Sequence, residues 1–239
     1  LCPRLDLFDS NMTLVGTPTL FIDGEWCASS DGGRRPTYNP YDASVIMHVD
    51  EATSNDARRA IAASKAFFSS SDWSRRSYQD RCELLNRMAD SLQKNKAELA
   101  RIETIDTGKT LGESEIDIDD VTNVFRFYAK EALKLAEDKR VTGPLVPESV
   151  KSLVVHEPVG VCVLITPWNY PILQLCWKLA PALATGNVVI VKPSEVTPLS
   201  TIYLVHMMLE VGFPSGSIQL LTASGASIGS CLLYTSDAA

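Results

Sequence analysis

Short apolar runs alternate with helix-like segments along the last third of the chain. The apolar runs cover 161–166, 188–191 and 218–221, and the helical segments cover 172–184, 199–211 and a stretch beginning at 225. Continuous apolar runs are typical of strands that are buried on both faces. Strands that alternate with helices connect as parallel, right-handed β-α-β units. The pattern therefore predicts an α/β protein with an open parallel sheet and at least three adjacent strands.

The first part of the chain has a different pattern. Residues 19–27 predict a hairpin that turns at Asp23-Gly24, a dipeptide that suits a two-residue hairpin turn. Segments 38–40 and 45–49 indicate further extended edges. Four helices are expected after them.

These helices are marked by start and stop signals. The first two starts have capping-box spacing, at Thr53/Asp56 and Ser77/Asp80. The third helix covers 97–106 and is expected to stop at Thr107-Gly108. The fourth has a single apolar stripe with three- and four-residue spacing: Val121, Val124, Phe125, Tyr128, Ala132 and Leu135.

Carboxylates gather at the start of the fourth helix, at Glu113, Glu115, Asp117, Asp119 and Asp120. A metal site is one interpretation of this cluster. The simpler interpretation is a solvated helix N-terminus, where negative charges suit the helix dipole.

Charge and composition exclude several classes of function. A net charge of −7 argues against binding to nucleic acid or to an anionic membrane surface. No apolar run approaches the ~18 residues of a membrane span, and residues 1–11 lack the pattern of a secretory signal. The six cysteines form no C-x-x-C pair, which favours reduced thiols and a cytoplasmic protein.

Both ends of the chain depart from these patterns. The first methionine is Met12, and the stretch after 230 continues no pattern that precedes it. We therefore expect 1–18 to be a disordered or non-native leader and 231–239 a non-native tail, with the folded unit at 19–230.

Unusual polar loops follow the three apolar strands. They cover 166–171, 192–195 and 222–229. In open parallel sheets, ligands bind beyond the carboxyl ends of the strands. The loops therefore predict one binding site at a single edge of the sheet.

The motifs Pro167-Trp168-Asn169-x-Pro171 and Lys192-Pro193-Ser194-Glu195 closely resemble the aldehyde dehydrogenase superfamily. The resemblance runs from about Leu20 to Ile228 and is strongest to the betaine aldehyde dehydrogenase-like branch. It includes Asp106-Thr-Gly-Lys109, Glu157-Pro-Val-Gly160, Ala180-Pro-Ala-Leu-Ala184 and Trp177-Lys178-Leu-Ala-Pro181.

The resemblance implies an incomplete, Rossmann-like NAD-binding sheet preceded by a helical amino-terminal segment. Residues 143–158 would be strands of the kind with which the family forms homo-oligomers. The implied reaction is NAD-dependent oxidation of a small-molecule aldehyde, such as betaine aldehyde, to the carboxylic acid.

Two residues are implied to take part in catalysis. The amide of Asn169 would hold the aldehyde oxygen as it becomes an oxyanion, which supplies ~3 kcal/mol of transition-state stabilisation. The alternative is that Asn169 caps the following helix. Lys178 resembles a lysine of a proton relay in the same branch, and the alternative is a surface lysine that extends to solvent.

The implied cofactor site uses the loops after the strands. Lys192 and Glu195 would bind the adenosine ribose, and the charge of Glu195 would favour NAD over NADP. The alternative is a surface ion pair. Gly225 and Gly229 would let the adenine approach a helix backbone. The remaining implied contacts are Ile165, Thr166, Pro167, Trp168, Pro193 and Ser194.

A potassium ion is also implied by the resemblance to some betaine enzymes, at Asp106 with the backbone near Thr37 and Val196.

The family's G-Q-x-C, E-L-G-G and F-T-G-S motifs do not occur in this chain. Cys162 and Cys176 lie in apolar settings that make a thiol inert. We therefore expect no catalysis from the chain alone. A cofactor-binding module without catalysis and a dimerising fragment remain alternative interpretations.

Overall fold

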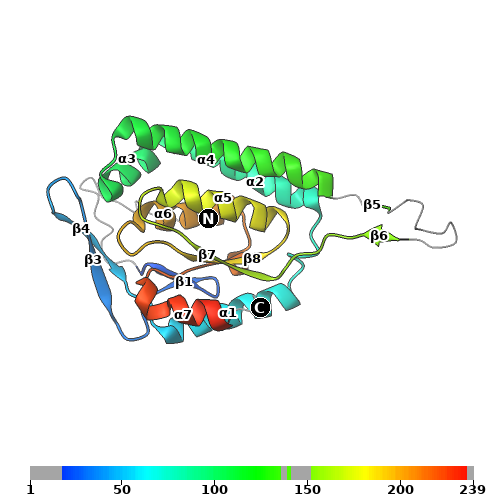
Figure 1. The fold of residues 1–239 in the computed structure, drawn as a ribbon, viewed down its shortest axis with the longest axis horizontal. Helices are drawn as coiled ribbons and strands as arrows, with labels where there is room; N and C mark the ends of the chain where they lie inside the picture. Colours follow the sequence, from blue (N-terminus) through cyan, green and yellow to red (C-terminus); the bar gives the residue numbers. More distant parts are fainter. Residues whose placement is uncertain (1–17, 136–138, 141–151, 236–239) are drawn as a thin grey trace.

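The structure is a computed structural model and describes residues 18–135, 139–140 and 152–235. A five-stranded sheet with the order β2-β1-β9-β8-β7 forms its centre (Figure 1). The strands are β1 Leu20–Ile22, β2 Glu25–Cys27, β3 Arg34–Tyr38, β4 Val45–Asp50, β5 Lys139–Arg140, β6 Leu153–Val154, β7 Val161–Ile165, β8 Val188–Lys192 and β9 Ile218–Leu220. The helices are α1 Ser54–Ser70, α2 Tyr78–Lys94, α3 Lys96–Thr107, α4 Leu111–Glu131, α5 Pro171–Ala184, α6 Leu199–Glu210 and α7 Gly225–Thr235.

The three predicted strands are parallel neighbours, as expected. The register of β7 on β8 runs from Val161 opposite Val188 to Ile165 opposite Lys192, and β9 pairs with the other side of β8. All of β8 is buried, whereas in β7 three residues are only partly buried, Ile165 is exposed and Leu164 alone is buried. The expectation that 161–166 is buried on both faces is therefore wrong. The reason is that β7 is the edge strand of the described sheet.

The amino-terminal hairpin extends this sheet. Asp23 and Gly24 have φ values of 56° and 82°, as the predicted tight turn requires. Phe21 of β1 pairs antiparallel with Leu220 of β9, and the backbone N–H of Asp23 donates to Oε1 of Gln219 across 2.7 Å. The sheet is therefore mixed, an addition that the sequence pattern does not predict.

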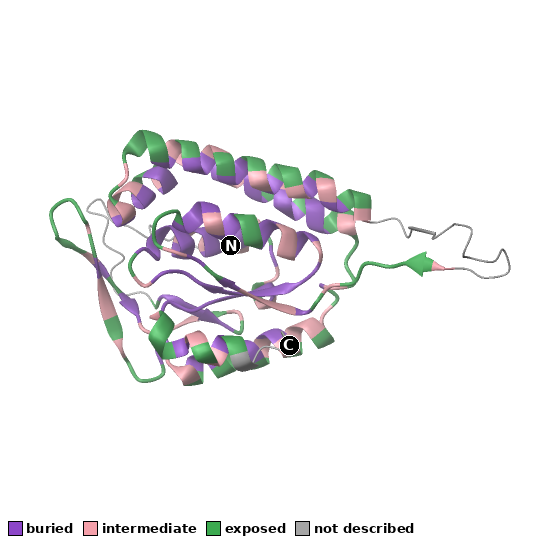
Figure 2. Cartoon of the chain, viewed as in Figure 1, coloured by how far each residue is buried: buried purple, intermediate pink, exposed green. Residues whose placement is uncertain are grey.

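Helices cover both faces of the sheet (Figure 1). Helices α1 and α7 pack together on one face, and α5 and α6 cover the other. A second layer of α2, α3 and α4 packs over α5 and α6, so these two helices are buried between layers (Figure 2). The β3–β4 hairpin forms a separate two-stranded sheet.

The predicted helix signals are present in the structure. Thr53 caps α1 with a reciprocal bond from Asp56, Ser77 caps α2, and Gly108 ends α3 at a φ of 80°. The structure adds a capping box at α4, where the hydroxyl of Thr110 accepts from the backbone N–H of Glu113.

The carboxylates at the start of α4 are only partly solvated. Asp117 is buried, contrary to the solvated interpretation, because the ammonium of Lys109 pairs with its carboxylate across 2.6 Å. Among the described residues, no group of three metal-binding side chains is present.

Some expected boundaries differ from the structure. Helix α7 passes residue 230 and ends at Thr235, and Leu232 is buried in the core. Residues 1–17 of the expected leader at 1–18 and the last four residues lie outside the described residues, as do 143–151 of the expected oligomerisation strands. In the described part of the chain, no helix is long and apolar enough to cross a membrane.

Candidate functional site

The loops after β7 and β8 are directly joined. The backbone N–H of Thr166 donates to the carbonyl of Lys192 across 3.1 Å, and the hydroxyl of Thr197 donates to the carbonyl of Trp168 across 3.0 Å. Because the strands are parallel, both loops leave the same edge of the sheet. The structure thus brings together the two motifs that the sequence singled out.

An open pocket of about 470 Å³ lies between α4 and the start of α5. Its lining consists of Lys109, Glu113, Ile116, Asp117, Asp120, Asn169, Tyr170, Leu173 and Trp177. The N-cap of α5 is Tyr170, with Pro171 at the first helical position, and no side chain caps the helix there. Asn169 is exposed in the pocket wall. The geometry thus gives no support to the helix-cap alternative for Asn169.

Lys192 and Glu195 lie together at the end of β8. Nζ of Lys192 donates to the carbonyl of Pro193 across 3.0 Å and lies 3.8 Å from Oε2 of Glu195. Burial lowers the pKa of Lys192, while the carboxylate of Glu195 acts in the opposite direction. Since Lys192 is only 3% exposed, the pair is not an ordinary surface ion pair.

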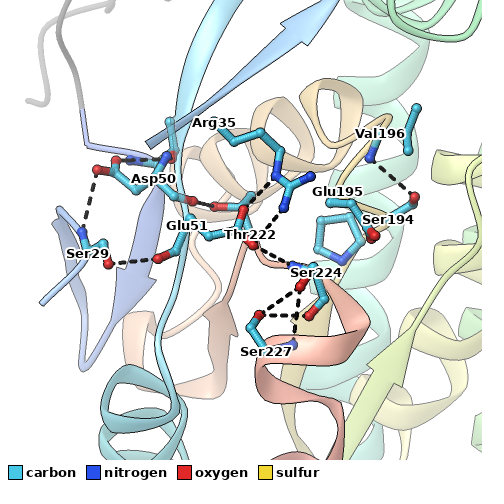
Figure 3. A network of polar contacts seen from close by, with 12 residues as sticks. Ser29, Arg35, Asp50, Glu51, Ser194, Glu195, Val196, Thr222, Ser224 and Ser227 are labelled. Carbon is cyan, nitrogen blue, oxygen red and sulfur yellow. Dashed lines mark hydrogen bonds and ion pairs between the residues drawn. The ribbon is translucent and has the colours of Figure 1, made fainter. Parts of the chain in front are cut away.

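Arg35 and Glu51 lie beside Glu195 and were not predicted from the sequence (Figure 3). The guanidinium of Arg35 makes two bonds to the carboxylate of Glu51, across 2.7 and 2.9 Å, and these bonds raise the pKa of Arg35. Glu51 also accepts from the backbone N–H of Ser224 across 2.9 Å. No residue spacing in the sequence of β3 indicates that Arg35 would contact Glu51.

Glu51 remains a strong anion in this network. Burial acts to raise the pKa of Glu51, but Arg35 and the Ser224 N–H lower it below its usual range. The network fixes the loop between β9 and α7 against the edge of β4. It therefore sets the position at which α7 begins.

Two glycines leave the backbone of α7 bare. A Cβ atom built at Gly225 or Gly229 would meet no atom within 4 Å. Packing within the described chain therefore does not require glycine at either position. A ligand that approaches the first turns of α7 closely would require it.

Lys178 does not extend freely into solvent. Its Nζ donates to the carbonyl of Ile165 at the end of β7, across 2.5 Å. This bond directs the ammonium toward the sheet edge at which the predicted site lies.

No hydrogen bond joins Asp106 to Val196 within the described residues. Asp106 is buried, and its Oδ2 accepts from the backbone N–H of Leu199 across 2.8 Å. Val196 is 57% exposed and its N–H donates to the hydroxyl of Ser194 across 3.3 Å. The hydroxyl of Thr37 donates to the carbonyl of Met47.

Cys162 of β7 and Cys176 of α5 are poor nucleophiles. Burial raises the pKa of Cys162, and burial raises that of Cys176 well above the usual value. Both thiols therefore remain protonated at neutral pH.

Comparison with known proteins identifies the family. The sequence profile described as "Aldehyde dehydrogenase family" matches residues 26–239. The chain belongs to the aldehyde dehydrogenase family. The resemblance of its two central motifs is thereby confirmed.

Relatives with several substrates match the chain. Betaine aldehyde dehydrogenase of Bacillus subtilis (strain 168) is 43% identical over 219 residues, which are 92% of this chain and 44% of that protein. Retinaldehyde dehydrogenase 3 of Mus musculus is 39% identical over 217 residues, covering 89% of this chain and 41% of that protein. These identities are too close to each other to determine the aldehyde, and the chain spans less than half of each relative.

Solved aldehyde dehydrogenases have the same fold. A betaine aldehyde dehydrogenase from Staphylococcus aureus in complex with NAD+ superposes with a TM-score of 0.84 and 44% identity. The match covers 89% of this chain and 42% of that one. The Rossmann-like, incomplete aldehyde dehydrogenase fold expected from the sequence is confirmed.

Proposed function

We propose that this chain is the amino-terminal, cofactor-binding part of an NAD-dependent aldehyde dehydrogenase that oxidises a cationic aldehyde. Betaine aldehyde is the first candidate substrate. The observation that carries the proposal is the junction of the loops after β7 and β8. It places Asn169 and the Lys192–Glu195 pair on neighbouring strand ends.

The residues of these loops suit a dinucleotide. Lys192 can donate to ribose hydroxyls and Glu195 can accept from them. The side chain of Glu195 is 31% exposed, so solvent and ligand can both reach it. Bare helix backbone at Gly225 and Gly229 suits the close approach of an adenine ring. NAD, when bound, would supply the hydride acceptor.

Asn169 suits the role of oxyanion donor. Its exposed side chain lines the pocket that an aldehyde would enter. An amide N–H directed at the carbonyl oxygen stabilises the negative charge that develops when a nucleophile adds. Lys178 is proposed to move protons along the sheet edge, where it already bonds the carbonyl of Ile165.

The pocket lining favours a positively charged aldehyde. Among the described lining residues are three carboxylates, those of Glu113, Asp117 and Asp120, and a single ammonium, that of Lys109. The rings of Tyr170 and Trp177 add aromatic faces, which attract quaternary ammonium groups. These features support betaine aldehyde over a neutral aldehyde such as retinaldehyde.

A potassium ion at Asp106 is a second part of the proposal. Oδ1 of Asp106 is buried and has no hydrogen-bond partner within the described residues. A buried carboxylate oxygen suits a cation of this kind. The backbone carbonyls near Thr37 and Val196 would be the other ligands.

We also propose that the complete protein is a homo-oligomer. The support is the exposed apolar surface of Leu153, Val154 and Val155, which are 56%, 44% and 58% exposed. An extended segment with these side chains suits burial against a second subunit.

The test is the complete protein that contains this chain, incubated with NAD and betaine aldehyde while NADH absorbance is followed. We expect NADH to form in proportion to the aldehyde oxidised. Binding of NAD without NADH formation from betaine aldehyde, an aminoaldehyde or retinaldehyde would support the alternative of a non-catalytic cofactor-binding module.

A further inference from the structure

Lys109 is an ammonium enclosed in the wall of the pocket. Its Nζ lies 2.6 Å from Oδ2 of Asp117 and 3.6 Å from Oε1 of Glu103. It also lies 4.3 Å from the centroid of the Tyr170 ring. The Lys109 side chain is only 12% exposed, so most of its surroundings are protein.

The backbone on both sides of Lys109 is fixed. Gly108 has the left-handed conformation and ends α3. A Cβ atom added to Gly108 would lie 2.7 Å from Cγ of Pro40, which is a clash. Thr110 begins α4 with a capping box. Lys109 is therefore the single residue between two helix caps, and these caps fix the point at which its side chain leaves the backbone.

Lys109 is the cation that lies between two enclosed carboxylates. Glu103 is fully buried and Asp117 is 5% exposed. Within the described residues, Lys109 is the only cation in an ion pair with either of them. Its charge cancels that of Asp117, so the remaining negative charge of the pocket comes from Glu113 and Asp120.

We propose that Lys109 is a specificity-determining residue of the aldehyde pocket. Its ammonium, held by Glu103 and Asp117 against the Tyr170 ring, sets the net charge that a substrate meets and limits the preference for cationic aldehydes. This inference rests on the proposed function. The proposed function relies on the acidic lining alone. Here the balance between the Lys109 ammonium and the carboxylates decides between cationic and neutral substrates.

The test compares two aldehydes of the same shape in the complete enzyme. Betaine aldehyde carries a trimethylammonium group, and 3,3-dimethylbutanal carries the neutral tert-butyl group in its place. Lys109→Met should increase the ratio of kcat/KM for the cationic over the neutral aldehyde by about threefold to tenfold. Asp117→Asn, which keeps the lysine, should decrease the same ratio by a similar factor. This second variant keeps the proposal testable if Lys109→Met does not fold.

Lys96→Met is the matched control. Lys96 of α3 pairs across 2.7 Å with Asp119, which lies on α4 as Asp117 does. Neither Lys96 nor Asp119 lines the pocket. This control should leave the ratio unchanged. Equal losses for both aldehydes in Lys109→Met would show that the lysine only supports the structure, and would overturn the proposal. The proposal would also be overturned if Asp117→Asn left the ratio of kcat/KM for the two aldehydes at the wild-type value.

A binding measurement separates this inference from the proposed reaction. Tetramethylammonium should quench tryptophan fluorescence through Trp177, with tighter binding to Lys109→Met and weaker binding to Asp117→Asn. If neither aldehyde is oxidised but these affinities shift as stated, the proposed reaction fails and the role of Lys109 in setting the pocket charge stands. Unchanged affinities in both variants would overturn the role of Lys109.

Discussion

The backbone N–H of Leu199 donates a hydrogen bond of 2.8 Å to Oδ2 of Asp106, 93 positions earlier in the chain. Helix α6 begins at Leu199, and its own N-cap residue, Pro198, offers no capping side chain. Asp106 of α3 therefore caps α6 from outside. The bond joins the outer helical layer to the layer that covers the sheet.

Asp106→Asn should alter the pH dependence of stability. Burial raises the pKa of Asp106 well above its ordinary value of 3.8, against the Leu199 N–H, which lowers it. The folded state therefore binds the proton of the Asp106 carboxyl more tightly than the unfolded state does. The protonated carboxyl contributes fully to stability below pH 3.8, and this contribution is lost as pH rises through the folded-state pKa. Asparagine keeps an acceptor oxygen and carries no charge.

The difference in Tm between Asp106→Asn and the wild type should therefore grow in favour of the variant as pH increases. Thermal unfolding at several pH values measures it, with Asp106→Ala as the control that loses the cap and about 1 kcal/mol. A Tm difference that is the same at every pH would contradict the assignment. Potassium chloride should raise Tm in the wild type alone if the cation binds at Asp106.

Glu195→Gln should reduce the preference for NAD over NADP. The substitution removes the charge that repels a 2′-phosphate but keeps much of the side chain's shape. NAD binding should weaken by roughly tenfold, because a charge-assisted hydrogen bond is worth ~1.5–3 kcal/mol. The measurement is kcat/KM for both cofactors in the complete enzyme, with the exposed Glu210→Gln as control. An unchanged NAD-to-NADP ratio would remove the ribose role from Glu195.

Asn169→Ala should decrease kcat by about 10² to 10³, the usual cost of losing one oxyanion donor. Steady-state kinetics of the complete enzyme provide the measurement, and NAD affinity should remain close to that of the wild type. Asn123→Ala, at an exposed position of α4 outside the pocket lining, is the control. A change confined to KM would indicate substrate binding and not oxyanion stabilisation.

Gly229→Ala should separate stability from cofactor binding. The added Cβ meets open space, and alanine favours a helix interior by about 0.5–1 kcal/mol over glycine. Tm should therefore stay the same or increase, while NAD affinity, measured by titration calorimetry, decreases. Unaltered NAD binding would mean that no ligand contacts this turn of α7.

The 239-residue chain alone should show no aldehyde oxidation with betaine aldehyde and NAD. The reason is that Cys162 and Cys176 are protonated thiols. NADH formation after purification from an expression host that lacks its own aldehyde dehydrogenases provides the measurement. Turnover that Cys176→Ala or Cys162→Ala abolishes would identify an unexpected nucleophile.

Local patterns predicted most of the secondary structure. Apolar runs identified β8 and β9 because these strands are enclosed by helices on both faces, and the Asp23-Gly24 turn identified the hairpin. The pairing of β1 with β9 was not predictable, since a strand of three residues carries no sign of its distant partner. The partial exposure of β7 was missed for a related reason: an apolar sequence does not reveal whether another strand covers its edge.

The part of the candidate site that lies in loops after the parallel strands was predicted from the sequence. Asn169, Lys192 and Glu195 follow strands whose parallel order can be derived, so their common edge was predictable. Arg35 lies on a strand of a different sheet, and only the folded structure places it beside Glu195. The burial of Asp117 depends on Lys109, a partner eight positions away across a helix cap, which charge counting along the sequence does not detect.

The pairing of the first hairpin with β9 has a consequence for the order of folding. Asp23 and Gln219 are separated by 196 residues, so the antiparallel edge of the sheet cannot form until nearly all of this chain has left the ribosome. Closing so long a loop is slow compared with local helix formation. The helices can therefore pack early, while the hairpin waits for its partner strand. Truncation before β9 would release the hairpin as well, although the two lie at opposite ends of the sequence.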